Sequence, residues 1–187
     1  MKKNRFPYII LVALGLAFLL QACNKSVNPS DTKIQFTTTS TSVKIPVMLR
    51  TSEYDSVIDF KYKINMDSFV KMINSGFDTG SIRSVKFTGC RLELDSNNTV
   101  DNFSNFNTCS IGLTTGTVPN LIKIASATDI PDTPAYFLNI PKTYDWDLKD
   151  YMRSDSLCYR IFGNVRRTST KALGFKAVFT YDMQLSN

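Results

Sequence analysis

Histidine is absent from all 187 residues of the chain. Its absence excludes Ser-His-Asp and Cys-His catalysis, zinc sites with imidazole ligands and pH switching by imidazole. An enzyme with this sequence would have to work with carboxylates, Tyr, Lys or an oxygen-ligated metal. The oxygen-rich stretch 95–101 lacks the Gly and the terminal Glu of an EF-hand loop. The sequence therefore predicts neither an enzyme nor a metal or cofactor site.

Long hydrophobic runs are also missing. The apolar stretch at residues 8–20 contains 13 residues, whereas a membrane-spanning helix needs roughly 20. It follows a basic start at residues 2–5 and precedes Leu-Gln-Ala-Cys at residues 20–23. A basic start, a short apolar run and a small residue before the cut are the parts of a secretory signal peptide. We therefore expect residues 1–22 to be removed on export.

The end of this segment resembles the lipobox of bacterial lipoproteins. The resemblance implies that the chain is cut between Ala22 and Cys23, and that Cys23 then carries acyl chains such as palmitate on its sulfur and its amine. Two or three chains anchor a protein stably, because each buried methylene contributes about 0.8 kcal/mol. The expected location is the bacterial cell envelope, at the outer membrane, with the periplasmic and surface leaflets both open.

Excess charge is small once the signal peptide is set aside. Residues 23–187 carry 19 basic and 16 acidic side chains, and so slight an imbalance gives no argument for a nucleic-acid partner. Residues 23–33 are polar and lack periodicity, which predicts a flexible tether after the lipidated Cys23. The remaining 34–187 stretch is long enough to form one domain with its own core.

The domain has the pattern of a β-sandwich. Apolar and polar residues alternate over 58–64 and most clearly over 175–185, as in half-buried strands. Further strands are expected at residues 43–50, 85–94, 105–114, 120–126, 135–140 and 157–167. Because these strands do not alternate regularly with helices, an antiparallel sandwich is predicted, immunoglobulin-like in outline and carrying two short helices at 67–73 and 145–152.

Two local features bear on strand pairing. The alternation changes phase within 85–94, where Val85 and Phe87 give way to Cys90, and a bulge at Gly89 would keep all three on the core face. A turn near residue 170 predicts that 157–167 and 175–185 form a C-terminal hairpin. That hairpin would gather five basic residues, Arg160, Arg166, Arg167, Lys171 and Lys176.

The chain beyond the lipobox resembles small all-β lipoproteins of unknown role from Bacteroidetes-type bacteria. The likeness lies in the polar tether, an extended strand leading into a short helix at 58–73, and a Leu-Lys-Asp-Tyr turn at 148–151 before the C-terminal strands. It implies a sandwich and no particular reaction. It also implies O-glycosylation at Asp-Ser sites followed by an aliphatic residue, which Ser56 and Ser156 match.

Three cysteines remain besides Cys23. Cys90 and Cys109 lie on the core faces of segments 85–94 and 105–114, and a hairpin between these segments would bring the two thiols together. A disulfide there would stabilise the fold by roughly 3 kcal/mol. The alternative is that both are buried thiols that pack as small hydrophobic groups. Cys158 is expected to be free.

The single tryptophan suggests a ligand site. Trp146 stands between Asp145 and Asp147, and an aromatic ring beside carboxylates suits sugar binding. The alternative is a core Trp next to acids that cap a helix.

Taken together, the sequence predicts a lipid-anchored binding or assembly module, an accessory subunit of an envelope protein complex. The alternative is a carbohydrate-binding surface lipoprotein that uses Trp146 and its neighbouring acids. A remote alternative is a glycoside hydrolase with two carboxylates in a cleft.

Overall fold

The computed structural model describes residues 32–49, 55–96 and 98–186. The predicted signal peptide, Cys23 and the tether up to residue 31 lie outside these residues and stay predictions. Within the described part, no helix is long and apolar enough to cross a membrane. Thr32 and Lys33, which the sequence assigned to the tether, already belong to the first strand.

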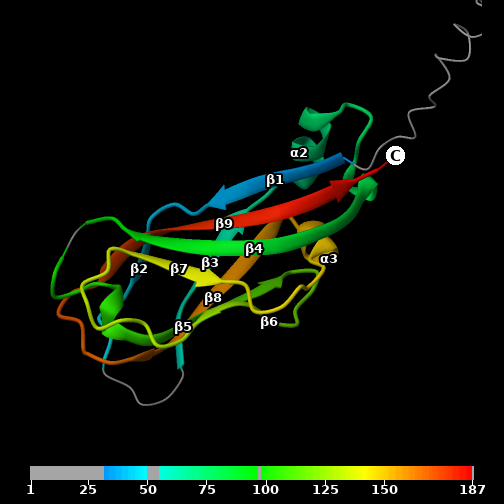
Figure 1. Ribbon diagram of the computed structural model, residues 1–187. Helices are drawn as coiled ribbons and strands as arrows, with labels where there is room; N and C mark the ends of the chain where they lie inside the picture. The colour runs from blue at the N-terminus through cyan, green and yellow to red at the C-terminus, as the bar shows by residue number, and fades with distance from the viewer. Residues whose placement is uncertain (1–31, 50–54, 97, 187) are drawn as a thin grey trace, which may run out of the picture. The chain divides into compact units, whose positions relative to one another are not determined.

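The described residues form nine strands and two short α-helices (Figure 1). The strands are β1 (Thr32–Thr39), β2 (Val43–Ile45), β3 (Asp55–Lys63), β4 (Ile82–Leu94), β5 (Phe106–Thr115), β6 (Ile122–Ala127), β7 (Phe137–Pro141), β8 (Ser156–Val165) and β9 (Leu173–Leu185). The helices are α2 (Met66–Ile73) and α3 (Lys149–Met152).

The strands pair as one nested hairpin. Leaving aside the short β2, the first strand pairs with the last (β1–β9), the second with the last but one (β3–β8), then β4–β7 and finally β5–β6. The pairings β4–β9 and β5–β8 join these into sheet A, of order β1-β9-β4-β7, and sheet B, of order β3-β8-β5-β6. Eight long strands wrapped in this way into two antiparallel sheets form a jelly roll.

The predicted antiparallel β-sandwich is therefore confirmed (Figure 1). The strand order differs from the expected immunoglobulin-like outline. In an immunoglobulin domain several consecutive strands share a sheet, whereas here β5 and β6 are the only consecutive long strands that do so in the described part. The bulge at Gly89 is also confirmed, since the register of β4 against β9 shifts between Phe87 and Gly89.

Two predicted hairpins are wrong. β8 and β9 lie in different sheets, and so do β4 and β5. A period of two determines which face of a strand is buried, but it does not determine which strand lies beside it. Crossing to the opposite sheet buries the same side chains as a tight hairpin would.

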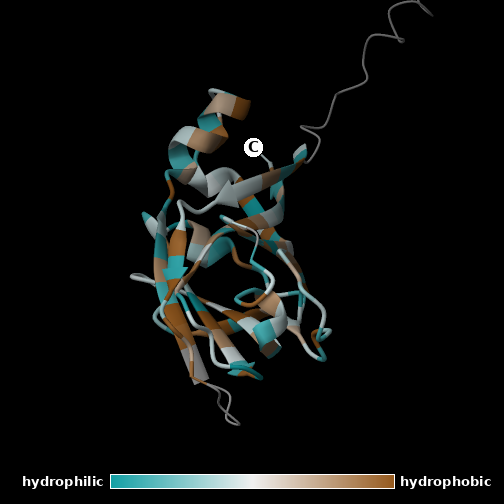
Figure 2. Ribbon diagram, turned by 90° about the vertical axis from the view of Figure 1, so that its left-hand side faces the viewer, coloured by the Kyte–Doolittle hydropathy of each residue, from teal (hydrophilic) through white to brown (hydrophobic). Residues whose placement is uncertain are grey.

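Aromatic side chains join the two sheets at the centre of the core. Tyr159 of β8 stacks on Phe179 of β9, with ring centroids 3.9 Å apart and planes inclined by 4°. The hydroxyl groups of Tyr159 and Tyr181 are hydrogen-bonded at 2.5 Å, so each buried phenol has a polar partner. Figure 2 shows hydrophobic and hydrophilic residues alternating along strands of the sandwich. Burial alternates in the same way along β8 and β9, which places these rings inside.

Both helices differ from their predicted bounds. α2 starts one residue earlier than expected because Asn65 caps it, with the Asn65 side chain accepting a hydrogen bond from the Ser68 amide. α3 contains only Lys149–Met152. The predicted helix at 145–152 was too long, and this places Trp146 outside a helix.

Candidate binding site

Residues 142–148 follow β7 and are fixed at both ends. The Thr143 amide donates to the Ile124 carbonyl of β6 at 2.9 Å, and the Leu148 amide donates to the Val85 carbonyl of β4 at 2.7 Å. Asp147 adds a second link to β4, since its carboxylate accepts hydrogen bonds from the amides of Val85 and Lys149, both at 3.0 Å. The segment is thus held between the two sheets.

Two aromatic side chains of this segment are exposed. Tyr144 and Trp146 form an edge-to-face pair with ring centroids 5.9 Å apart and planes inclined by 71°. Tyr144 is 61% exposed and Trp146 is 46% exposed. Neighbouring exposed rings on a fixed backbone offer a ligand apolar contact without a large ordering cost. The alternative that Trp146 is a core residue, which the sequence left open, is therefore wrong.

The two acids beside Trp146 have different environments. Asp145 is exposed and forms an ion pair with Lys142 at 2.5 Å. The hydrogen bond and the charge of Lys142 hold the pKa of Asp145 below its ordinary value, and the Lys86 ammonium acts more weakly in the same direction. The carboxylate of Asp147, in contrast, already accepts hydrogen bonds from two backbone amides and so positions the segment. Asp145 is therefore the acid available to a ligand.

Lys86 connects this segment to a groove on the outer face of sheet A. Its backbone forms an isolated antiparallel bridge with Asp147, and its side chain lines a groove of about 570 Å³. The other polar side chains that line the groove come from β1, β4 and β9, namely Lys33, Gln35, Ser84, Asp182 and Gln184.

These groove residues form two rows across the strands. Register places Lys33, Gln184 and Ser84 in one row. The second row contains Gln35, Asp182 and Lys86. Within the rows, the Gln35 amide donates to Asp182 at 3.0 Å and the Ser84 hydroxyl donates to Gln184 at 3.3 Å. The groove thus presents hydrogen-bond donors and acceptors of the kind that hydroxyl-rich ligands need.

The two cysteines for which a disulfide and free thiols were both open are buried. Cys90 lies on β4 and Cys109 on β5, strands of opposite sheets, and each side chain faces the shared core. Both thiols are free in this structure. Burial raises the pKa of Cys109 to about 12 and raises that of Cys90 as well, with a smaller contribution from Cys109. Cys158 is free, as expected, and half-buried.

The two predicted glycosylation serines lie in strands of sheet B. Ser56 is in β3 next to a register shift, and its side chain lies outside the described residues. Ser156 is the first residue of β8 and is half-buried. Modification of either serine stays a prediction.

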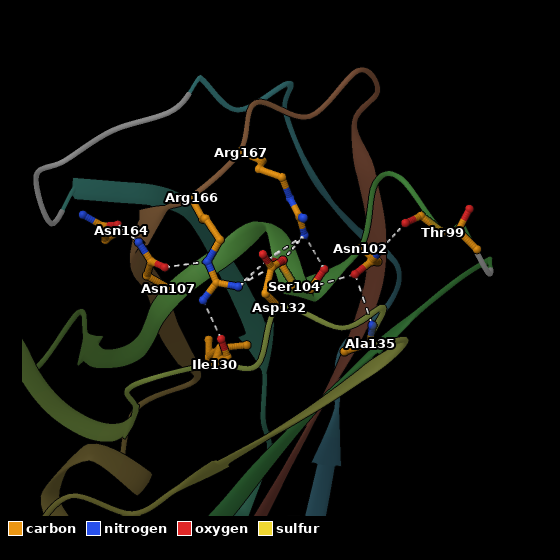
Figure 3. Close-up of polar contacts among 10 residues, drawn as sticks. All are labelled: Thr99, Asn102, Ser104, Asn107, Ile130, Asp132, Ala135, Asn164, Arg166 and Arg167. Carbon is orange, nitrogen blue, oxygen red and sulfur yellow. Dashed lines mark hydrogen bonds and ion pairs between the residues drawn. The ribbon is translucent and has the colours of Figure 1, made fainter.

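The basic residues expected on a C-terminal hairpin are dispersed. Arg160 forms a two-point ion pair with Asp59 on sheet B. Arg166 and Arg167 both contact Asp132 and tie loops together at one end of the sandwich (Figure 3). Because β8 and β9 are in different sheets, Lys176 lies on sheet A, whereas Arg160 lies on β8 in sheet B. The hairpin that was expected to gather the five residues does not form.

Sequence reasoning missed Tyr144 and all of the groove residues. Tyr144 had a usable signal, since it stands two residues before Trp146 and an extended backbone places such residues on one side. For the groove, the sequence indicated which residues face outward but not which strands are neighbours. Alternation marks Lys86, Asp182 and Gln184 as outward-facing, but nothing in the sequence places β4, β9 and β1 side by side.

Within the described part of the chain, no group of three or more His, Cys, Asp or Glu side chains is placed to hold a metal ion. No protein-family model matches the chain. No characterised protein matches its sequence either. Among solved structures, the chain is similar to a chain of Desmodium yellow mottle tymovirus at 6% identity, over 86% of this chain and 91% of that one, with a TM-score of 0.29. A likeness of this level carries no argument about function.

Proposed function

We propose that this protein is a carbohydrate-binding lipoprotein of the bacterial cell envelope, anchored at the outer membrane through Cys23. The exposed Tyr144–Trp146 pair supports the binding role most directly. Sugar rings present apolar C–H groups that pack on aromatic faces, and their hydroxyl groups pair with carboxylates and amides. Asp145 and the polar rows of the groove supply such partners nearby.

The backbone around the pair also supports binding. Hydrogen bonds at Thr143, Asp147 and Leu148 hold the segment before any ligand arrives. A site that is already ordered loses less conformational entropy on binding. The proposal is limited to binding and does not include hydrolysis. The groove has one carboxylate, Asp182, whereas glycoside hydrolysis uses two facing carboxylates.

Glycan binding can be measured by fluorescence, since Trp146 is the only tryptophan. The full chain, purified in detergent, is titrated with a panel of polysaccharides while the tryptophan emission is followed. A ligand that packs on the ring should shift or quench that emission. No change with any polysaccharide, together with no heat of binding by calorimetry, would count against the proposal.

Variants then separate the site from the rest of the surface. Trp146→Ala and Tyr144→Ala should each weaken binding about tenfold or more by calorimetry, as expected for an aromatic hot-spot residue. Phe137→Ala is the matched control, because Phe137 is 52% exposed on β7 and its ring lies under Arg91. Equal losses in all three variants would argue against a specific site.

The lipid anchor needs its own test. Labelling cells with a palmitate analogue should mark the wild-type chain and leave Cys23→Ser unmarked and uncut. Membrane fractionation then shows whether the chain is in the inner or the outer membrane. Labelling of the Cys23→Ser variant would refute the anchor, whereas a soluble, labelled wild type would refute stable attachment.

A role as an accessory subunit is the second candidate. It draws on the edge strands of the two sheets, among them β1 in sheet A and β3 in sheet B. Exposed strand edges can pair with a partner chain. Charged residues on β3, among them Asp59 and Lys61, limit unspecific pairing. Crosslinking in intact cells followed by purification of the tagged protein should yield one stoichiometric partner if this role is correct.

A further inference from the structure

We propose that the groove on sheet A selects a glycan that carries acidic groups, with Lys33 and Lys86 as the residues that recognise them. This inference rests on the proposed carbohydrate-binding function and names its ligand class. It extends the site from the Tyr144–Trp146 pair to the groove. The groove lies on β1, β4 and β9, which the sequence did not place side by side.

The first argument is the distribution of charge within the groove. Its lining contains two ammonium groups and one carboxylate. Asp182 accepts a hydrogen bond from Gln35, which takes up part of its acceptor capacity. Across the described residues, no carboxylate lies within ion-pair distance of Lys33 or Lys86. Both ammonium groups therefore have donors free for an anionic ligand.

The second argument is the placement of the two lysines. Lys33 belongs to the row of Gln184, and Lys86 belongs to the row of Asp182, on opposite sides of β9. They occupy diagonal corners of the two rows. Strand spacing and rise put their Cα positions about 12 Å apart. A chain of several sugar rings with acidic groups along it can therefore meet both ammonium groups.

The third argument is the position of Lys86 between the groove and segment 142–148. Its charge is felt by Asp145, and its backbone bridges to Asp147. An acidic group at Lys86 would compete with Asp145 for the ammonium, and Asp145 retains Lys142 as its ion-pair partner. A chain bound along the groove can therefore reach the segment that carries the aromatic pair without leaving a carboxylate unpaired.

The test compares polymers that differ only in charge. Binding of the full chain in detergent is measured by calorimetry with polygalacturonate and with its carboxyl-reduced, neutral form. Dextran sulfate and dextran form a second pair, which distinguishes sulfate from carboxylate recognition. Charge-assisted hydrogen bonds are roughly twice as strong as neutral ones, so we expect about tenfold tighter binding of one anionic polymer over its neutral partner.

Substitutions assign the preference to residues. Lys33→Gln and Lys86→Gln should each reduce it several-fold, and the double variant should abolish it. Lys176→Gln is the matched control, because Lys176 is exposed on β9 in the same sheet and should leave the preference unchanged. Both groove lysines are exposed, so the variants should fold, which circular dichroism checks.

The outcomes separate the two proposals. Equal binding of charged and neutral polymers, a preference that survives the double variant, or one that Lys176→Gln also removes would overturn this inference. In those cases binding that depends on Trp146 would leave the carbohydrate-binding function standing. Failure of every polymer to bind would overturn both.

Discussion

Aromatic side chains in the core and in segment 142–148 are held in place by different forces. Tyr159, Phe179 and Tyr181 are fully buried between the sheets, where packing and the hydrophobic effect fix them. Tyr144 and Trp146 keep about half of their surface in solvent, and hydrogen bonds of the flanking backbone fix them instead. Substitutions in the first group should therefore affect stability, whereas substitutions in the second should affect binding.

The largest effect is expected at the centre of the core. Phe179→Ala removes the ring that stacks on Tyr159 and should lower the free energy of unfolding by about 3–5 kcal/mol. Urea unfolding followed by circular dichroism measures this loss. Phe137→Ala, at an exposed position of β7, is the control and should lose far less. Similar losses in the two variants would remove the distinction between core and surface.

High pH should weaken the core through its buried acids. Burial raises the pKa of Cys109 to about 12, and it also raises those of Cys90, Tyr159 and Tyr181. The folded state then holds protons that the unfolded state releases. The contribution of these groups to stability is therefore constant below about pH 8.5, the ordinary thiol pKa, and is lost as the pH rises toward 12.

Cys109 alone should account for about 3 kcal/mol of this loss by pH 11. Urea unfolding at pH 8 and pH 11 measures the loss, and Cys109→Ala should show a smaller difference between the two pH values. An unchanged free energy of unfolding at pH 11 would mean that these groups are more accessible to solvent than the structure indicates.

A smaller loss is expected where the segment is attached. Asp147→Ala removes the acceptor for the amides of Val85 and Lys149 and should cost about 1 kcal/mol of stability. It should also weaken glycan binding, because Tyr144 and Trp146 lose part of their support. Asp147→Asn keeps an oxygen acceptor and should retain most of both properties, as urea unfolding and calorimetry can show. If both variants bind like the wild type, the attachment does not organise the site.

The smallest effect on stability is expected at the exposed pair. Tyr144→Ala should change the free energy of unfolding by no more than about 0.5 kcal/mol, as is usual for surface positions, while reducing glycan affinity. Thermal unfolding of the variant beside the wild type gives the first value. A loss above about 2 kcal/mol would show that Tyr144 belongs to the core and not to a ligand site.

Particular elements show where sequence reasoning succeeded. The alternation over 175–185 identified the inward face of β9, and the phase change at Gly89 identified the bulge in β4. Both follow from local geometry, because successive side chains of a strand point to opposite faces. The sequence also indicated Trp146 and its acids, although not that Asp147 holds the backbone while Asp145 stays open.

The chain's own pattern indicated the strands other than β1 (Thr32–Thr39), their buried faces and the all-β class, since these depend on residues close in sequence. Only the tertiary structure decided that β8 and β9 part into opposite sheets and that β1, β9 and β4 lie side by side. These pairings bring together residues as far apart as Gln35 and Asp182, and the energy that selects them comes from packing of the whole core. For the same reason the aromatic pair can be suspected from sequence, whereas the groove can be found only in the fold.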